Sequence, residues 1–205
     1  MKKFVLDTNL FFNMEAGLGL GSKTEEVVRA MTEGMRRLKE SGTHEFYTPP
    51  RIMEEFLSFF EDKTQEFLQE FQHEVITKAP HANELQVAAP VLYQMVDEAR
   101  SRNYRGAAVA EEEIQKAGRA MAQAHDLSKK DFEMTIGPVI KNFRDRYRQT
   151  TRFGFLDSVA DLDIIMLARE LDGVIVSSDE GVIRWGRIFG VREMGVPAFG
   201  SMLKG

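Results

Sequence analysis

Four aspartates stand where carboxylates could gather around a metal ion. Asp7 follows the apolar run of residues 4–6, and Asp179 follows a second apolar run in "VIVSSDEG". Such runs are typical of strands in a parallel sheet, and open α/β sheets bind ligands at the carboxyl ends of their strands. Asp157 and Asp161 are four residues apart in a segment with helical periodicity, so their carboxylates should share one helix face and repel each other unless a cation lies between them. If the two strands are sheet neighbours, all four acids converge on one pocket.

A pocket of this composition favours a hard divalent cation. The chain has no cysteine, and no histidine is well placed beside these acids, so the ligands would be carboxylate oxygens, which suit Mg²⁺ or Mn²⁺ better than zinc. Two such cations about 4 Å apart could activate a water for in-line attack on a phosphodiester and neutralise the leaving oxygen. Each aspartate alone could be a helix cap or a solvated charge, and Glu180 and Asp163 beside them could be bystanders. The prediction of a metal site therefore depends on the four aspartates together.

Alternating strands and helices must position these acids. Helical periodicity covers residues 22–41 and 155–171, Pro50 could open a long helix through Phe71, and "GVIRWGRIFG" reads as a short helix. The phenylalanines of the long helix are expected to be core rather than a base-stacking surface. Short strands are expected at 4–6, 45–50, 173–181 and, last, in "GVPAF". This βα alternation predicts an α/β fold with a parallel or mostly parallel sheet.

The middle of the chain differs from both ends in its composition. Residues 88–125 are rich in Ala, Glu, Arg and Met and carry no strand signal. They predict an antiparallel helical hairpin that turns near Gly106 and buries one apolar face of each helix against the other. These faces hold Leu92, Met95, Val96, Ala99, Ile114, Ala117, Met121 and Ala124. A projecting arm of this kind needs a partner, which would be another subunit or a large ligand.

A basic segment, "KNFRDRYRQTTR", follows the predicted arm. It holds five basic residues and one acid, and on a helix its basic side chains recur at steps of three and four. Such a stripe suits a row of backbone phosphates. The alternative is a solvated helix face with intrahelical ion pairs, which the near absence of acids disfavours. We therefore predict RNA binding by Lys141, Arg144, Arg148 and Arg152.

Composition sets the outer limits. The chain has 205 residues, of which 43% are hydrophobic and 29% charged, as in an ordinary globular protein with one domain and an insertion. Without cysteine it can form no disulfide, which favours the reducing cytoplasm, and no stretch approaches the roughly 20 apolar residues of a membrane span or the pattern of a signal peptide. The net charge of −5 argues only mildly against a nucleic-acid partner, because it leaves room for a local basic patch.

The motifs together resemble those of the PIN-domain metallonucleases. "FVLDTNLFFN", "DSVADLDIIMLA" and "VIVSSDEG" look like the three acidic motifs of that family. The helical insertion and the basic segment before the second motif are similar, more narrowly, to the minimal protein-only ribonuclease P enzymes, the homologues of Aquifex RNase P. The resemblance covers nearly the whole chain.

The resemblance implies a fold, a site and a reaction. The fold would be a PIN-like α/β/α sandwich, formed by residues 1–82 and 127–205, with an inserted arm at 83–126. Asp7, Asp157, Asp161 and Asp179 would bind Mg²⁺ or Mn²⁺, Glu180 ranks next, and the family's glutamate after the second strand would be Glu54 or Glu55. The reaction would be hydrolytic removal of the 5′ leader of precursor tRNA, which leaves a 5′-phosphate on the mature tRNA. The arms would join subunits into a homo-oligomer, a dodecamer built from dimers, and help to measure the tRNA.

Three other interpretations compete with this one. A haloacid-dehalogenase-like phosphatase would need a second acid where the chain has Asn9. A toxin-type PIN ribonuclease shares the acids but is usually shorter and lacks the central insertion. A non-catalytic RNA-binding or assembly module would keep only the fold, and the presence of all four aspartates counts against it.

Overall fold

The computed structural model describes residues 1–205 except 14, 16, 123–126, 153 and 157, and the side chain of Arg152 is also outside the described part. The chain divides into two compact units. Met1–Val87 and Gly154–Gly205 form one, which we call the α/β unit. Ala88–Phe153 form the other, the helical unit.

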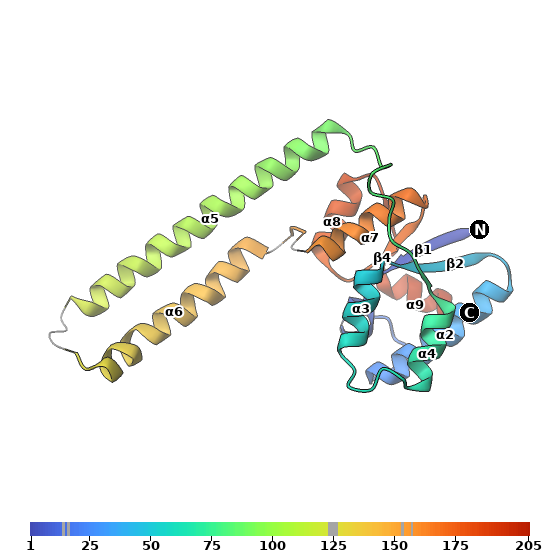
Figure 1. Cartoon of the computed structure of the whole chain (residues 1–205), viewed down its shortest axis with the longest axis horizontal. Helices are drawn as coiled ribbons and strands as arrows, with labels where there is room; N and C mark the ends of the chain where they lie inside the picture. The colour runs from blue at the N-terminus through green and yellow to red at the C-terminus, as the bar shows by residue number, and fades with distance from the viewer. Residues whose placement is uncertain (14, 16, 123–126, 153, 157) are drawn as a thin grey trace. The chain divides into compact units, whose positions relative to one another are not determined.

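A five-stranded sheet is the centre of the α/β unit (Figure 1). Its order is β3-β2-β1-β4-β5, and every pairing is parallel. The predicted α/β fold with a mostly parallel sheet is confirmed. The strands are β1 (Lys2–Leu6), β2 (His44–Thr48), β3 (Ile76–Thr77), β4 (Val174–Val176) and β5 (Arg192–Glu193).

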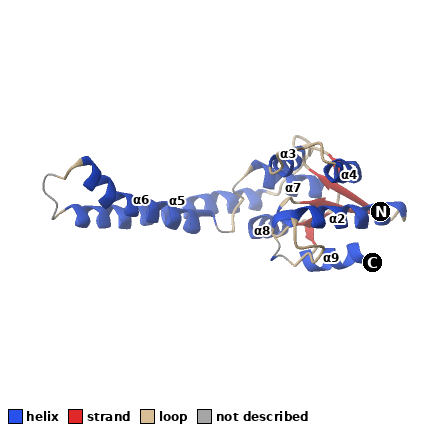
Figure 2. Cartoon of the chain, turned by 90° about the horizontal axis from the view of Figure 1, so that it is seen from below, coloured by secondary structure: helices blue, strands red, loops and turns tan. Residues whose placement is uncertain are grey.

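Helices lie on both faces of this sheet (Figure 2), as a parallel sheet requires. No helix in the described part of the chain is long and apolar enough to cross a membrane. The helices of this unit are α1 (Asn9–Phe12), α2 (Thr24–Glu40), α3 (Pro50–Ser58), α4 (Glu66–Glu74), α7 (Val159–Glu170), α8 (Glu180–Ile188) and α9 (Val196–Lys204).

Phenylalanine rings fill much of the core. Phe4 of β1 is fully buried and stacks on Phe46 of β2, with ring centroids 5.8 Å apart. A second group joins α1, α3 and α4, where Phe56 lies 4.7 Å from Phe11 and 5.0 Å from Phe71. The predicted core role of the phenylalanine stripe is confirmed for these rings.

Three predicted elements differ from the structure. The long helix from Pro50 to Phe71 is two helices, α3 and α4, because Asp62 accepts hydrogen bonds from the backbone N and the hydroxyl of Thr64 at 2.8 and 2.6 Å and so favours a turn. "GVPAF" does not close the sheet as a strand but opens α9, since Gly195 is the N-cap and the proline lies in the first turn. The last strand is β5, whose two residues are too short to give a periodic signal.

The helical unit consists of two long antiparallel helices, α5 (Ala89–Met121) and α6 (Lys129–Arg152). The predicted turn at Gly106 is wrong, because α5 runs through this residue. A β-carbon at Gly106 would lie 2.7 Å from the Tyr147 ring, so the glycine allows α6 to approach closely. The structure therefore packs α6 against α5, whereas the predicted arm is limited to residues 83–126 and residues 127–152 are predicted to belong to the core domain. The apolar faces of the predicted hairpin do not meet, and Leu92 and Ile114 are more than half exposed.

A buried carboxylate joins the two long helices. Glu113 of α5 is 3% exposed and accepts hydrogen bonds from Lys116 at 2.6 Å, Arg146 at 2.6 Å and Asn142 at 2.9 Å. Hydrogen bonds from Lys116, Arg146 and Asn142 lower the pKa of Glu113 to about 2, against the opposing effect of burial. Charged donors hold a buried carboxylate far better than neutral ones. This cluster should therefore fix the register of α5 against α6.

We expect Glu113→Gln to lower the thermal midpoint of the protein, because the amide loses the charge that Lys116 and Arg146 balance. Glu111→Gln, an exposed position on the same helix, is the matched control and should change little. Because the folded pKa of Glu113 is depressed, its contribution is present above pH 4.5 and is lost as the pH falls toward 2. Melts followed by circular dichroism at several pH values measure both effects; equal midpoints for the two variants would contradict this role.

Candidate active site

Asp7 lies at the carboxyl end of β1, next to the end of β4. β1 and β4 are sheet neighbours, with Leu6 opposite Val176, and the backbone N of Asp7 donates to the Val176 carbonyl at 3.1 Å. This confirms the strand placement on which the predicted convergence of acids depends. The Asp7 side chain is buried, with 3% exposed, and accepts hydrogen bonds at 3.2 Å from the backbone and the side-chain amide of Asn9.

Ser177 links Asp7 to Asp179. Its hydroxyl donates to Asp7 Oδ2 at 2.5 Å and accepts from the backbone N of Asp179 at 2.9 Å. Asp179 is also the N-cap of α8, where its Oδ1 accepts from the backbone N of Val182 at 2.9 Å. One oxygen of Asp179 therefore positions the start of α8. The structure brings together these two of the predicted site residues.

The environment of Asp7 opposes a bare negative charge. Burial is the largest cause that raises its pKa, to about 6, and the nearby Asp179 carboxylate raises it further, while the hydrogen bonds from Ser177 and Asn9 oppose the change. At neutral pH the buried site thus holds a desolvated carboxylate beside a second acid. A hard cation would offset both charges, and the oxygen donors fit Mg²⁺ or Mn²⁺.

An open pocket of about 480 Å³ begins at this edge of the sheet. It is lined by Asn9, Phe12, Asn13, Ser178 and Asp179. The Asn13 amide donates to the Ser178 hydroxyl at 3.4 Å, so polar groups from the residue after α1 and from the loop after β4 meet there. Ser177, Ser178 and the two asparagines were not predicted as site residues, although polar residues directly after each apolar run were a signal for them.

Asp161 lies in the first turn of α7. Its side chain accepts from the backbone N of Ser158 at 3.2 Å, and the Ser158 hydroxyl accepts from the backbone N of Asp161 at 3.0 Å. This reciprocal capping starts the helix at Val159, later than the predicted start at residue 155. Asp157 is outside the described residues, so its predicted place beside Asp161 stays a prediction. In the described part of the chain, no three Asp, Glu or His side chains lie close enough to hold a metal ion.

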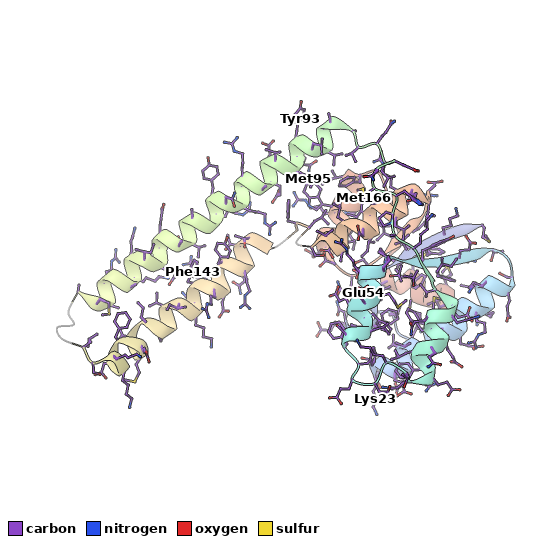
Figure 3. All side chains as sticks on the ribbon, viewed as in Figure 1. Lys23, Glu54, Tyr93, Met95, Phe143 and Met166 are labelled. Atoms are coloured by element: carbon purple, nitrogen blue, oxygen red, sulfur yellow. The ribbon has the colours of Figure 1, made fainter. Side chains whose placement is uncertain are left out.

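The other candidate acids lie in more open surroundings. Glu180 is the first residue of α8 and is exposed. Asp163 is half-buried and lies 3.5 Å from the Arg51 guanidinium; burial raises its pKa and Arg51 opposes the rise. Glu54 and Glu55 are exposed on α3, where Figure 3 labels the former. Their roles as ligands stay predictions.

Comparison with known proteins decides the family. A family model described as PINc domain ribonuclease matches residues 3–205, nearly the whole chain. The chain belongs to the PINc domain ribonucleases. Membership confirms the resemblance that the acidic motifs suggested.

Several relatives of this PINc domain ribonuclease carry a more specific name. The present chain is 34% identical to the protein named RNA-free ribonuclease P of Haloarcula marismortui, over 99% of this chain and 90% of that protein. The proteins of the same name from Hyperthermus butylicus and Thermococcus onnurineus are 34% and 32% identical, over 100% and 99% of this chain and 88% and 94% of their own lengths. The similarity therefore includes both the α/β unit and the helical unit.

The predicted basic stripe lies on α6 of this PINc domain ribonuclease. Lys141, Arg144 and Arg148 are exposed, and none of the three forms an ion pair with another described residue. Arg146, which is outside the stripe, pairs instead with Glu113 at 2.6 Å. The structural ion pair and the stripe thus use different side chains of one helix. The side chain of Arg152 is outside the described part.

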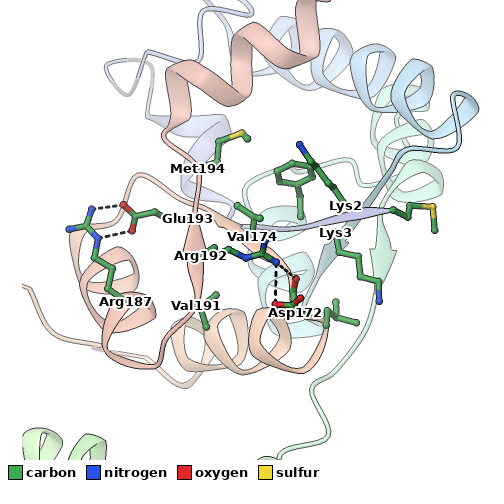
Figure 4. Close-up of a pocket in the computed structure, with 12 residues that line it drawn as sticks. Lys2, Lys3, Asp172, Val174, Arg187, Val191, Arg192, Glu193 and Met194 are labelled. Carbon is green, nitrogen blue, oxygen red and sulfur yellow. Dashed lines mark hydrogen bonds and ion pairs between the residues drawn. The ribbon is translucent and has the colours of Figure 1, made fainter.

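A larger hollow, of about 890 Å³, lies at the other edge of the sheet (Figure 4). Its lining includes the first residues of β1 and β4, both residues of β5, and Arg187 of α8. Arg187 and Arg192 there are paired: the first binds Glu193, and the second donates to the carbonyl and carboxylate of Asp172 at 2.7 and 3.1 Å. None of the predicted site acids that the structure describes lines this hollow. The carboxyl edge with Asp7 and Asp179 is the better candidate for the active site.

We expect Asp7→Asn to stabilise the metal-free protein at pH 7. The pKa of Asp7 in the folded protein is raised to about 6. The contribution of this carboxyl group to the stability of the wild type is therefore fully present below pH 3.8 and is lost as the pH rises through 6. An amide avoids that loss, which is worth about 1–3 kcal/mol at about 1.4 kcal/mol per pKa unit.

Denaturant unfolding in a chelator at several pH values measures this difference between variant and wild type. It should shrink toward pH 4, where the wild-type carboxyl is protonated. Glu40→Gln, at an exposed position of α2, controls for general charge effects. A variant less stable than the wild type at pH 7 would show that the hydrogen bonds to the carboxylate outweigh its burial.

Proposed function

We propose that this chain is an RNA-free ribonuclease P, a metal-dependent endonuclease that removes the 5′ leader of precursor tRNA and leaves a 5′-phosphate on the mature tRNA. The buried Asp7 carboxylate, joined through Ser177 to Asp179 at the carboxyl edge of the sheet, is the observation that carries the proposal. Nearly full-length similarity to proteins named RNA-free ribonuclease P supports the choice of substrate.

The proposed metal site consists of Asp7, Asp157, Asp161 and Asp179, with Glu180 as a further candidate ligand. Mg²⁺ is the expected ion, with Mn²⁺ as the alternative. When bound, such ions supply an activated water and stabilise the leaving oxygen. The protein's part is to hold the carboxylates in place: Asn9 and Ser177 orient Asp7, and helix capping orients Asp161 and Asp179.

Backbone phosphates of the RNA are proposed to bind the stripe formed by Lys141, Arg144, Arg148 and Arg152. Exposure and the absence of ion pairs among the described members support this assignment. A precursor tRNA carries phosphates over a surface much larger than the active-site pocket. The stripe would therefore supply affinity, and the α/β unit would supply the reaction.

The helical unit is also proposed to assemble the protein into a homo-oligomer, a dodecamer built from dimers. An apolar groove of about 290 Å³ between α5 and α6 supports this idea. Ile114 and Ile140 line it and are 69% and 42% exposed. Glu113 lines it as well, and its Oε2 is buried without a hydrogen-bond partner among the described residues. A second copy would cover the apolar side chains. The proposed location is the cytoplasm.

Incubation of the purified protein with end-labelled precursor tRNA and Mg²⁺ tests the function. One cut at the 5′ end of the mature sequence is expected, and a chelator should abolish it. Equal cleavage of mature tRNA and unstructured RNA would favour a toxin-type ribonuclease. Binding without cleavage would favour a non-catalytic RNA-binding or assembly module.

In this assay, Asp7→Asn, Asp157→Asn, Asp161→Asn and Asp179→Asn should each lower the single-turnover rate about 100-fold or more. Each amide keeps the shape but loses the charge that binds the cation, and every 1.4 kcal/mol of lost stabilisation costs a tenfold rate. Glu40→Gln is the control with an exposed acid outside the site. Near-normal rates in two of the four variants at saturating Mg²⁺ would refute the assigned site.

Replacing Arg144 and Arg148 together by Ala should weaken precursor binding more than it slows cleavage at saturating enzyme. Because fewer counterions are released, the negative slope of log affinity against log salt should become shallower by about 2. Lys23→Ala with Lys63→Ala, two exposed lysines of the α/β unit, is the charge-matched control. Titrations at several salt concentrations decide the matter, and an unchanged slope would leave the stripe as a solvated face.

A further inference from the structure

Two phenylalanine rings meet at the candidate active site. Phe12, the last residue of α1, lines the same pocket as Asp179, Asn9 and Asn13. Phe59, just after α3, packs on Phe12 with ring centroids 4.2 Å apart and ring planes at 41°. We call this pair, Phe12 and Phe59, the aromatic pair.

Packing alone does not explain the position of Phe59. The neighbouring rings of the cluster, Phe11, Phe56 and Phe71, are at most 2% exposed, whereas Phe59 is 59% exposed. Burial of a phenylalanine side chain is worth about 1.5–3 kcal/mol, so exposure forgoes much of that stabilisation. In the described part of the α/β unit, the other large apolar side chains this exposed are Met1 and Val159, and neither is aromatic. Phe59 is thus an aromatic ring held at the surface beside the catalytic edge.

The ring is also fixed in place from behind. Phe12 contacts Phe59, and its ring centroid lies 6.1 Å from that of the buried Phe56, so tilted ring contacts connect the exposed ring to the core. A phenylalanine with two side-chain torsions loses little entropy on binding when it is already held in this way. The geometry is that of a preformed surface for a flat ligand.

We propose that the aromatic pair stacks an unpaired base of the RNA substrate next to the scissile phosphate. This inference rests on the proposed function and names a substrate contact for the same site. Every nucleobase has a π-face, so stacking on an aromatic side chain binds any base. A single-stranded leader offers unstacked bases, whereas the bases of a tRNA stem are already stacked on their neighbours.

The surroundings favour an RNA base over a protein partner. The pocket that Phe12 lines also contains the Asn9 and Asn13 amides and the Ser178 hydroxyl, which can hydrogen-bond to the edges of a base or to a ribose. Asp179 lines the same pocket, so a base stacked on the aromatic pair is attached to a backbone near the candidate metal ligands. An apolar protein surface would leave these polar groups without partners.

The aromatic pair has a defined chemical test in Phe59→Leu and Phe59→Trp. Leucine keeps an apolar side chain but has no π-face, whereas tryptophan keeps and enlarges it. We expect Phe59→Leu to raise the enzyme concentration needed for half-maximal single-turnover cleavage by about 5- to 100-fold, the range for one stacked base, and Phe59→Trp to restore it.

A precursor with an abasic nucleotide beside the cleavage site completes the cycle. If the base stacks on Phe59, the wild type should lose affinity for the abasic RNA, and Phe59→Leu should bind intact and abasic RNA alike. An abasic site several nucleotides upstream in the leader is the matched control and should leave the effect of the substitution unchanged. Additive losses from the variant and the abasic nucleotide would overturn the proposal.

A binding measurement separates this inference from the proposed function. A fluorescent adenine analogue placed beside the cleavage site should be quenched by the wild type in a chelator, where no cleavage occurs, and Phe59→Leu should abolish the quenching. The same probe in an unstructured RNA tests stacking even if the precursor is not cleaved. Unchanged quenching would overturn the proposal, as would a smaller particle mass for Phe59→Leu with unaltered RNA binding, which would mark Phe59 as a contact between copies of the chain.

Discussion

The parallel pairing of β1 with β4 is the constraint on which the candidate site depends. Residues 170 positions apart in the chain, Asp7 and Ser177, can share a hydrogen bond only because these two strands are neighbours and end together. The same pairing places the start of α8, and with it Asp179, beside the start of α1. The chain between them adds β2 and the edge strand β3, together with helices that exclude water from the faces of the sheet. Without this pairing the acids would be scattered surface charges.

The fold holds Asp7 in surroundings that disfavour its ionised form. Burial and a second carboxylate both disfavour ionised Asp7, and the hydrogen bonds from Asn9 and Ser177 only partly compensate. A residue chosen for stability at this position would be neutral. A carboxylate that is costly in the free protein becomes favourable when a cation arrives, which is consistent with a nuclease that binds metal at this edge.

The two units are stabilised by different kinds of interaction. The α/β unit stacks phenylalanine rings around a dry core, whereas the helical unit has few buried side chains and relies on Glu113, Arg146 and the close approach at Gly106. A unit with so little core exposes much apolar and basic surface. That surface is available for a large ligand or for further copies of the chain, in keeping with a substrate much larger than the pocket.

The sequence by itself determined the features that depend on local pattern. The apolar runs before Asp7 and Asp179 predicted two buried parallel strands, and the βα alternation predicted the sheet and its covering helices. The acidic motifs also indicated the family, because their residue types and spacing are properties of the chain alone. Local pattern could not place the turn of the helical unit, since a glycine marks a close helix contact as readily as a turn.

Tertiary structure decided what depends on distant partners. Ser177 became a site residue because β4 lies beside β1, which no periodicity in "VIVSSDEG" reveals. Phe59 follows the buried Phe56 by only three residues, yet it lies just past the end of α3 and its ring is 59% exposed. Hydrophobic spacing records which residues prefer burial; only packing in three dimensions determines which of them obtain it.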